Sequence, residues 1–398
     1  MRASQPLLAM QAPSGLQKGK RSQAARAGSL LLVLLALAAT LLAPLGGCAA
    51  DPARSTDTGS DAAQATQHVT DMAGRSVEVP VVVDKIVGFG SVPLRTISYL
   101  GAVDMLSGVE LAEQTDYVTC GYRHVNFEQF KALPVVGEGG SNGVTPNEEA
   151  LALAHPDVVF ASIDKDAADA LQQKTGIPVI CIAQSDKIFD ARYYEAIRLI
   201  GTVIKKDARA EELVGYLEAT QADLAKRTSG AAADRPTAYA AGISFRGGHG
   251  FAGTEALFPP FVETGITNVA DVGGASGAYD IDIEQVLTAQ PDFVFVETSN
   301  LSLVKEDYLA NPSYFSHLEA VRNKSTYTLV SYRFYGANIE LAVANCYWVG
   351  SVAYPEQFSD VDPTQKLDEI TTFFLGKPLA SDLAAQGYSF RQVDFEDL

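Results

Sequence analysis

The chain has 398 residues, with 48 acidic and 30 basic side chains and a formal net charge of −18. So acidic a protein is a poor partner for nucleic acid or for an anionic lipid surface, because like charges repel. Its four cysteines show no C-x-x-C spacing, which argues against a zinc site built on cysteine pairs.

The N-terminus has the pattern of an export signal. Residues 1–28 contain five basic side chains and no acidic one, and an apolar run follows over 30–42. That order and length are typical of a secretory signal. The run leads into Leu45-Gly46-Gly47-Cys48, which resembles the lipobox of bacterial lipoproteins. We predict a signal peptide over 1–47 and a lipidated Cys48 on the extracytoplasmic face of the membrane; the alternative is a buried cysteine after a short membrane anchor.

Residues 48–66 are rich in Asp, Ala, Ser, Thr and Gln and lack apolar periodicity, which predicts a flexible tether. Loss of the signal would leave 25 basic and 48 acidic residues, a net charge near −23. About 330 residues then remain beyond the tether, enough for two domains with their own cores.

Strand-like and helix-like segments alternate along the first half of this region. A hairpin is expected over 69–80, with its turn at Gly74. Strands are expected at 85–89, 157–161 and 177–182, and helices at 93–100 and 167–174. This alternation indicates an α/β fold with mainly parallel sheets.

An internal repeat indicates two similarly built lobes. The segment 149–160, a short helix from Glu149 through Pro156-Asp157 into an apolar strand, is echoed by 284–295. Between the copies, 207–228 has apolar residues at helical spacing and Asp207 as the expected N-cap. We predict an N-terminal lobe over 67–206, one long bridging helix over 207–229 and a C-terminal lobe over 230–398.

Several segments together resemble the periplasmic-binding-protein family of iron–siderophore, haem and cobalamin ABC importers. They are Thr70-Asp71 through Pro80, the Pro-Asp repeat, Ser244 through Gly250, and 341–345 with 354–358. The resemblance covers about residues 67–390 and implies two Rossmann-like lobes joined by a single long helix. It also implies an ABC permease as partner, docked through one acidic residue per lobe. Those residues match Glu149 and Glu284; the other interpretation is that each only favours its helix N-terminus, and Glu148 could replace Glu149.

Ligands of open parallel sheets bind beyond the carboxyl ends of the strands, so loops there supply the candidate ligand-binding residues. An Arg- and Tyr-rich cleft suits an anionic, flat ligand, since guanidinium pairs with oxyanions and phenol rings stack on aromatic groups. Each of these side chains could instead be an ordinary loop, surface or core residue. The candidates are Arg95, Tyr122, Arg123, His124, Arg246, His249, Tyr279, Arg333 and Tyr335.

The expected cargo is an iron complex, a ferric siderophore first, with haem, cobalamin and molybdate or tungstate as alternatives. No resident cofactor is expected. A secreted metal-dependent enzyme or a metal-dependent adhesin is the less favoured class. The chain has no H-E-x-x-H motif and no phosphate loop with Lys, and Gly137-Glu-Gly139-Gly140 lacks dinucleotide spacing.

Overall fold

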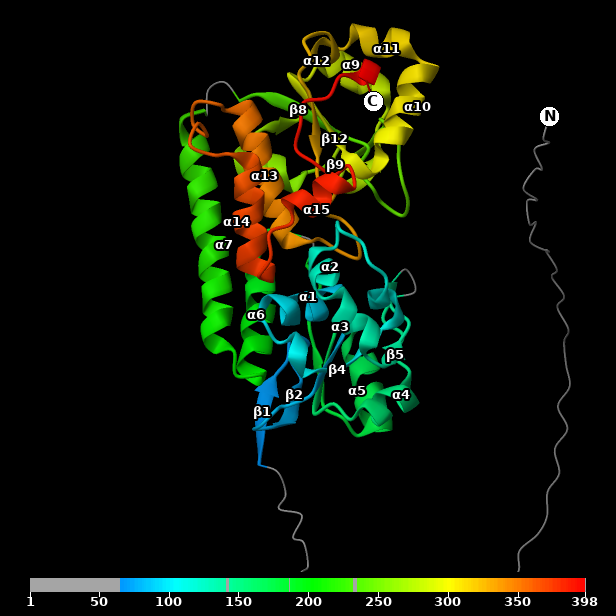
Figure 1. Cartoon of the computed structure of the whole chain (residues 1–398), viewed down its shortest axis with the longest axis vertical. Helices are drawn as coiled ribbons and strands as arrows, with labels where there is room; N and C mark the ends of the chain where they lie inside the picture. The colour runs from blue at the N-terminus through cyan, green and yellow to red at the C-terminus, as the bar shows by residue number, and fades with distance from the viewer. Residues whose placement is uncertain (1–64, 141–142, 186, 232–234, 398) are drawn as a thin grey trace, which may run out of the picture. The chain divides into compact units, whose positions relative to one another are not determined.

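The computed structural model of this protein describes residues 65–397 except 141–142, 186 and 232–234 (Figure 1). The predicted signal, Cys48 and nearly all of the tether lie outside these residues. Within them, no helix has the length and hydropathy needed to cross a bilayer. The chain opens with the expected hairpin, in which β1 (Thr66–Thr70) pairs antiparallel with β2 (Ser76–Pro80). Residue 66, assigned to the tether from the sequence, is thus the first of β1.

The N-terminal half is built on one sheet of five parallel strands. Their spatial order is β5 (Val135–Gly137), β4 (Leu106–Glu110), β3 (Ile86–Phe89), β6 (Val158–Ala161) and β7 (Val179–Cys181). Numbered by their order along the chain, these five strands lie in the order 3-2-1-4-5 of a Rossmann-like sheet. The strand order reverses at β3, while all strands stay parallel. The helices of this half are α1 (Ser91–Tyr99), α2 (Gly121–Val125), α3 (Phe127–Ala132), α4 (Glu148–Ala154), α5 (Lys165–Thr175) and α6 (Ala191–Val203).

The C-terminal half has its own parallel sheet, in the order β10 (Thr267–Asn268), β8 (Thr237–Ala241), β12 (Phe293–Glu297) and β13 (Thr326–Leu329). A small antiparallel pair, β9 (Gly253–Ala256) and β11 (Gly277–Asp280), accompanies it. The α/β fold with mainly parallel sheets is therefore confirmed. The helices are α8 (Pro259–Thr264), α9 (Ile283–Ala289), α10 (Leu301–Ala310), α11 (Pro312–His317), α12 (Glu319–Arg322), α13 (Ile339–Ala353), α14 (Pro363–Leu375) and α15 (Ala380–Ala385).

The repeated Pro-Asp segment performs the same structural task in both halves. Helices α4 and α9 each end in a left-handed residue, His155 at φ 46° and Gln290 at φ 44°. The aspartate that follows then accepts a backbone N–H at the start of a neighbouring strand: Asp157 from Lys85 at 2.8 Å, and Asp292 from Thr237 at 2.7 Å. The repeat therefore anchors the first strand of each sheet to the helix–strand corner beside it.

The long helix α7 (Asp207–Thr228) lies within the predicted range 207–229, and it contacts α6, α8 and α13. Its N-cap is Lys206, not Asp207 as predicted: Asp207 is the first helical residue and accepts a hydrogen bond from the Thr202 hydroxyl at 2.7 Å. Figure 1 shows α13 and α14 running alongside α7. The connection between the two sheets is therefore a packed layer of helices, and α14 also contacts α1 and α2.

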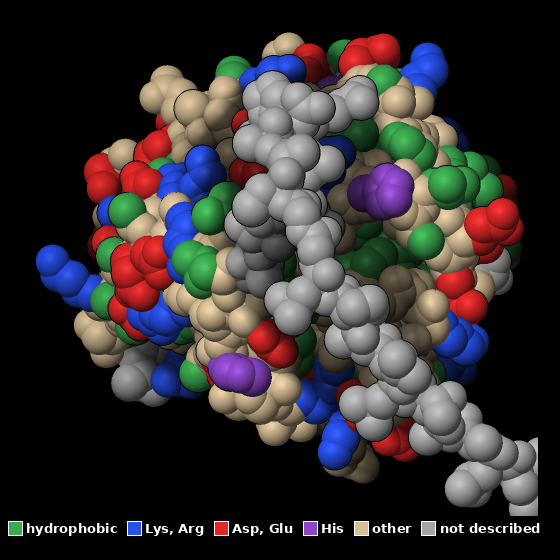
Figure 2. Space-filling model, turned by 90° about the horizontal axis from the view of Figure 1, so that it is seen from below, with side chains coloured by type: hydrophobic (Ala, Val, Ile, Leu, Met, Phe, Trp, Pro, Cys, Tyr) green, Lys and Arg blue, Asp and Glu red, His purple; other side chains and the backbone are tan. Residues whose placement is uncertain are grey.

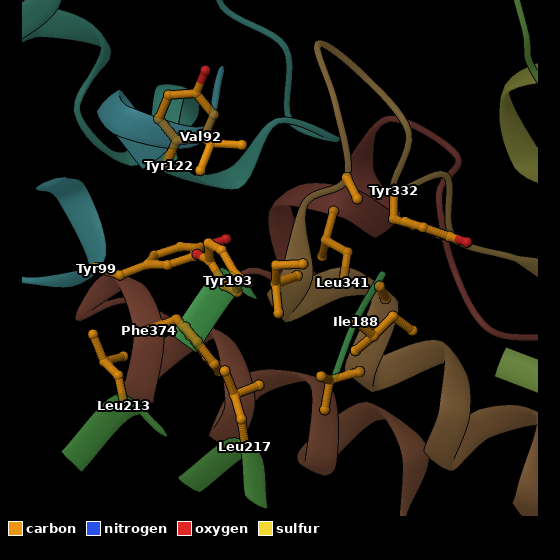
Figure 3. Packing of buried hydrophobic residues seen from close by; sticks show 14 of the residues in the cluster. Val92, Tyr99, Tyr122, Ile188, Tyr193, Leu213, Leu217, Tyr332, Leu341 and Phe374 are labelled. Carbon is orange, nitrogen blue, oxygen red and sulfur yellow. The ribbon is translucent and has the colours of Figure 1, made fainter. Parts of the chain in front are cut away.

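One hydrophobic core runs from the N-terminal half into the C-terminal half. It joins Tyr99 of α1, Leu213 and Leu217 of α7, Leu341 of α13 and Phe374 of α14, and Figure 3 shows these side chains gathered in one cluster. The rings of Tyr99 and Phe374 meet edge to face at 4.9 Å. Because burial of this surface requires both halves, the described residues form one compact unit. The boundaries predicted at 206 and 229 stay a prediction.

Cys120, Cys181 and Cys346 are all buried and unpaired. The sequence alone leaves open whether Cys120 forms a disulfide; among the described cysteines it does not. Burial raises the pKa of Cys181 to about 11, which keeps that thiol protonated and unreactive at neutral pH.

Truncation of the bridging helix should destabilise the whole unit. Leu213 is fully buried, so we expect Leu213→Ala to lower the free energy of unfolding by about 2–5 kcal/mol, because the cavity stays largely unfilled. Leu309, 65% exposed on α10, is the matched control, and Leu309→Ala should change it by less than about 0.5 kcal/mol. Denaturant unfolding measures both free energies. Equal losses of stability in the two variants would contradict the claim that packing of α7 in the shared core stabilises the whole unit.

Candidate functional site

The loops that follow the parallel strands of both sheets face a common cleft. In the N-terminal half, the cleft residues come after β4 and β5. In the C-terminal half they come after β8, β12 and β13. Carboxyl ends of parallel strands are the usual ligand-binding edge of such sheets, because the connecting loops there are free to carry functional side chains.

The larger part of the cleft, here called the main cavity, has a volume of about 830 Å³. Its functional side chains are Tyr117, Arg123, Arg246, Phe334 and Tyr335. The rings of Tyr117 and Phe334 lie against each other at 4.3 Å between centroids. Among the described residues that line this cavity, none carries a carboxylate. Its lining is therefore cationic and aromatic although the chain as a whole is strongly acidic.

A smaller neighbouring space of about 400 Å³ shares Tyr117, Arg246, Phe334 and Tyr335 with the main cavity. Its remaining lining is mostly neutral and hydrogen-bonding, so we call it the serine compartment: Ser244 after β8, Ser299 and Asn300 after β12, and Ser331 after β13. Arg333 also borders it and pairs with Glu255.

Arg123 is held in place by a buried carboxylate. Its Nε donates to Glu113 Oε2 at 2.8 Å, and the Tyr122 hydroxyl donates to the same carboxylate at 2.9 Å. Burial acts to lower the pKa of Arg123, but Tyr122 and Glu113 outweigh it and raise the pKa above its usual value. Among the described residues, no acceptor reaches Arg123 Nη2. This nitrogen is a buried donor without a partner in the described part of the chain, on a residue that lines the main cavity.

Tyr335 connects the cavity to the contact between the two halves. Its backbone is left-handed, with φ 51°, which is strained for a residue with a side chain. Its carbonyl accepts from Arg95 Nη2 at 2.8 Å, and its hydroxyl donates to Glu110 Oε2 at 2.7 Å. The Arg123 guanidinium lies 5.5 Å from its ring. These contacts fix Tyr335 in an unfavourable conformation, and Arg246, at φ 51°, is a second strained residue of the lining.

Glu110 lies at the end of β4, fully buried beneath Tyr335. Besides the phenol, it accepts the Gly90 N–H at 2.9 Å. The glycine-rich loop packs on it closely: a Cβ at Gly139 would stand 2.8 Å from its carboxyl carbon. Burial raises the pKa of Glu110 to about 7, an effect that these two hydrogen bonds only partly oppose. A proton on Glu110 therefore exchanges near neutral pH at the junction of the two halves.

The structure brings four of the predicted ligand residues to the cleft, namely Arg123, Arg246, Arg333 and Tyr335. Arg95 and Tyr122 are buried just behind it, where the Arg95 guanidinium lies over the Tyr122 ring at 5.2 Å. For these residues, contact with a ligand stays a prediction.

Three other candidates lie outside the lining of both spaces, and each has structural partners. His124 contacts Asp116 at 2.8 Å and Asp382 at 3.4 Å. His249 pairs with Asp280 at 2.9 Å and stacks on Phe245. Tyr279 donates to the Ala270 carbonyl at 2.7 Å. Each of these contacts provides a structural role, and His249 supports the loop that carries Arg246.

Several cleft residues were missed in the sequence. Ser299 and Asn300 directly follow the strand at 293–297, so the rule that places ligands beyond strand ends could have found them. Glu110 carries no such signal, because its partner Tyr335 lies 225 residues away. Glu113 lies only 10 residues from its partner Arg123, but a loop at that spacing predicts no particular contact. Phe334 was missed because a lone aromatic residue is most simply assigned to the core.

Two arrangements typical of enzymes can be compared with the described residues. No cluster of three or more His, Cys, Asp or Glu side chains able to hold a metal ion occurs among them. Gly139 through Gly143 matches the G-x-S-x-G spacing of hydrolases, although Ser141 is outside the described residues. In a nucleophile elbow the serine joins a strand directly to a helix. Here β5 ends at Gly137 and α4 begins only at Glu148, so the loop lacks that context.

Glu149 and Glu284 occupy equivalent exposed positions, each the second residue of its short helix. The neighbouring Glu148 pairs with Lys174 at 2.7 Å, whereas no ion pair of Glu149 occurs among the described residues. This contrast favours Glu149 over Glu148 as a carboxylate available to a partner.

On the face in Figure 2, acidic and basic side chains are interspersed.

The fold and the cleft are those of a two-sheet solute-binding protein. Residues 101–332 match the family model described as "Periplasmic binding protein", and the chain belongs to this family. Comparison with curated proteins finds no significant match.

Solved structures share the fold at low sequence identity. A periplasmic solute-binding protein from Veillonella parvula is 19% identical, with 81% of this chain and 97% of that chain covered and a TM-score of 0.63. The TroA-like periplasmic binding protein FepB of the same organism is 23% identical, with coverages of 82% and 99% and a TM-score of 0.63. The molybdate-bound periplasmic binding protein MolA of Haemophilus influenzae is 21% identical, with coverages of 78% and 98% and a TM-score of 0.59.

The raised pKa of Glu110 predicts a pH-dependent stability. The folded state binds this proton more tightly than the unfolded state, whose carboxyl has a pKa near 4.5. The contribution of this proton to the free energy of unfolding is therefore complete below pH 4.5, and it is lost as the pH rises toward 7. We expect the wild type to lose up to about 3 kcal/mol relative to Glu110→Gln between about pH 5 and 8. Denaturant unfolding of both proteins across this range measures the difference; parallel profiles would contradict the assignment.

Proposed function

We propose that this protein is the extracytoplasmic binding component of an ABC importer and that its cargo is an iron complex, a ferric siderophore first. The observation that carries the cargo proposal is the main cavity, where Arg123, Arg246 and three aromatic rings meet without a carboxylate in the described lining. Guanidinium groups favour anionic oxygen ligands, and aromatic faces favour planar rings. Anionic iron chelates with aryl or carboxylate groups combine both features.

The size of the cleft supports a chelate over a small oxyanion. A cavity of about 830 Å³ falls within the range of pockets that enclose drug-sized ligands. A bare metal ion would require a set of protein ligands, and the described residues offer no such cluster. A metal would therefore arrive already wrapped in its own chelator. The same reasoning supports a binding protein over a metal-dependent enzyme or adhesin.

Haem, cobalamin and the oxyanions molybdate or tungstate are the alternative cargoes. The molybdate-bound relative supports the oxyanion alternative only at the level of a shared fold, since its identity to this chain is 21%. Haem iron is commonly held by a histidine as axial ligand. Neither His124 nor His249 lines the main cavity among its described residues, so neither supports haem as cargo there.

Loss of the exposed guanidinium of Arg246 should weaken cargo binding. With residues 49–398 produced as a soluble protein, we expect a ferric catecholate or hydroxamate to bind, and Arg246→Gln to reduce its affinity at least about ten-fold, since hydrogen bonds to charged groups contribute about 1.5–3 kcal/mol. Isothermal titration measures both proteins. Arg322→Gln, which removes an exposed arginine of α12 that pairs with Glu319, is the matched control and should bind as the wild type does.

The same titration, extended to haem, cobalamin, molybdate and tungstate, separates the cargo classes. Binding of only one of these ligands would leave the proposed role in an ABC importer standing. It would overturn the proposal that the cargo is a ferric siderophore. Equal losses of ligand affinity in Arg246→Gln and Arg322→Gln would indicate that the ligand binds outside the cleft.

We further propose that Glu149 and Glu284 dock onto basic side chains of the permease. One exposed carboxylate from each half lets the permease sense the spacing between the halves, and charge complementarity specifies the partner. In a reconstituted uptake assay, Glu149→Lys and Glu284→Lys should each reduce transport at least about ten-fold without changing cargo affinity. Glu148→Lys, one residue away, is the control and should transport nearly normally. Normal transport by the Glu149→Lys, Glu284→Lys double variant would refute the docking role.

Membrane attachment through lipidated Cys48 completes the proposal, supported by the lipobox-like sequence before it. We expect Cys48→Ser to release the protein from the membrane fraction of expressing bacteria, because the anchor is lost. Fractionation with radiolabelled palmitate tests this. A Cys48→Ser protein that stays in the membrane would instead indicate an uncleaved N-terminal anchor.

A further inference from the structure

The serine compartment has a chemistry different from that of the main cavity, although the two spaces share a wall. Its hydrogen-bonding side chains are Ser244, Ser299, Asn300 and Ser331. They come from the ends of β8, β12 and β13, so three adjacent parallel strands aim neutral polar groups at one space. Aromatic rings of Phe245 and Tyr388 complete the lining.

These polar groups are fixed in position by their own hydrogen bonds. Asn300 Nδ2 donates to the Gly242 carbonyl at 2.7 Å and to Ser244 Oγ at 2.8 Å. The Ser299 N–H donates to Ser331 Oγ at 3.1 Å. The Ser299 and Ser331 hydroxyls contact each other, and the Ser244 and Ser331 hydroxyls hydrogen-bond to Glu297. A hydroxyl has one proton and two lone pairs, so Ser244 and Ser299 each keep a lone pair for a further donor. Ser299 is exposed and is thus the most accessible of them.

Local charge makes a second anionic subsite here unfavourable. Glu297 is buried behind the compartment and accepts the Ser244 N–H at 2.6 Å. Arg333, which borders the compartment, pairs with Glu255. Glu255 thus offsets the charge of Arg333, and Arg246 lies on the wall shared with the main cavity. A negative ligand group seated among the serines would face Glu297 behind them. A neutral arm with several hydroxyl groups would donate to this lining at no such cost.

We propose that the cargo has two parts: an anionic planar head in the main cavity and a neutral, hydroxyl-rich arm of the glycosyl type in the serine compartment. This inference rests on the proposed function, because it specifies which anionic chelates the cleft selects. It makes Ser299 and Ser244 specificity-determining residues. They discriminate between chelates that share a head and differ in the arm.

The test uses a matched pair of probes: a ferric tris-catecholate carrying glucosyl groups and the same chelate without them. With the protein of residues 49–398, we expect the glucosylated chelate to bind about ten-fold tighter, as expected for two or three added hydrogen bonds. Ser299→Ala should reduce that ratio to about three-fold or less. Ser244→Ala is the second variant, and Ser313→Ala, an exposed serine of α11, is the control.

Each outcome decides a separate point. Equal affinity for the two chelates, tighter binding of the plain one, or a preference unaffected by both serine variants overturns the arm while the iron-chelate function stands. Binding of neither chelate overturns the proposed cargo and this inference together. A glucosyl preference lost in Ser299→Ala but kept in Ser313→Ala supports the two-part ligand.

Discussion

The rest of the structure depends on one constraint, the hydrophobic core that α7, α13 and α14 share with both sheets. Leu213, Leu217 and Leu341 are fully buried in it, and so are side chains from α1 and α6 on the N-terminal side. Because both halves contribute to the same buried surface, wide separation of the sheets would expose that surface to water. The strand ends that carry the cleft residues are consequently held at a nearly fixed spacing. Closure around a ligand should then be a small adjustment, not a large hinge motion.

Polar contacts at the cleft floor complement this core. Arg95 and Glu110 from the N-terminal half hold the carbonyl and the hydroxyl of Tyr335 from the C-terminal half. In a buried setting each of these groups would be costly without its partner, so the network specifies one arrangement of the two halves. It also couples the cavity lining to a carboxyl whose pKa is about 7. The cleft thereby combines a rigid frame with one titrating group.

Much of the fold was predictable because local patterns determine it. The bounds of the long helix followed from apolar spacing, and the repeated Pro-Asp corner revealed two similar sheets; the structure adds that Asp157 and Asp292 anchor β3 and β8. The N-cap at Asp207 was wrong because cap position depends on where the preceding chain turns. Cleft residues were harder to predict. Arginines and tyrosines in loops after strands were expected at the carboxyl ends of the strands, and Arg246 and Tyr335 do line the main cavity. Their contact with a ligand stays a prediction.

What sequence could not supply was the partner of each side chain. The contact of Glu110 with Tyr335 joins segments 225 residues apart, and that of His249 with Asp280 joins segments 31 apart, so no local pattern indicates them. Glu113 lies only 10 residues before Arg123, but their pairing depends on how the intervening loop folds. The neutral character of the serine compartment likewise appears only when the ends of β8, β12 and β13 are brought side by side.

The most direct test of the account is a crystal structure of residues 49–398 with a ferric catecholate, with data collected at the iron absorption edge. We expect one anomalous iron peak inside the main cavity, with chelate oxygens or carbonyls facing Arg123 and Arg246 and a ring against Tyr117 or Phe334. An iron peak outside this cavity, or iron held directly by protein side chains, would contradict the proposed binding of an intact anionic chelate in the cleft.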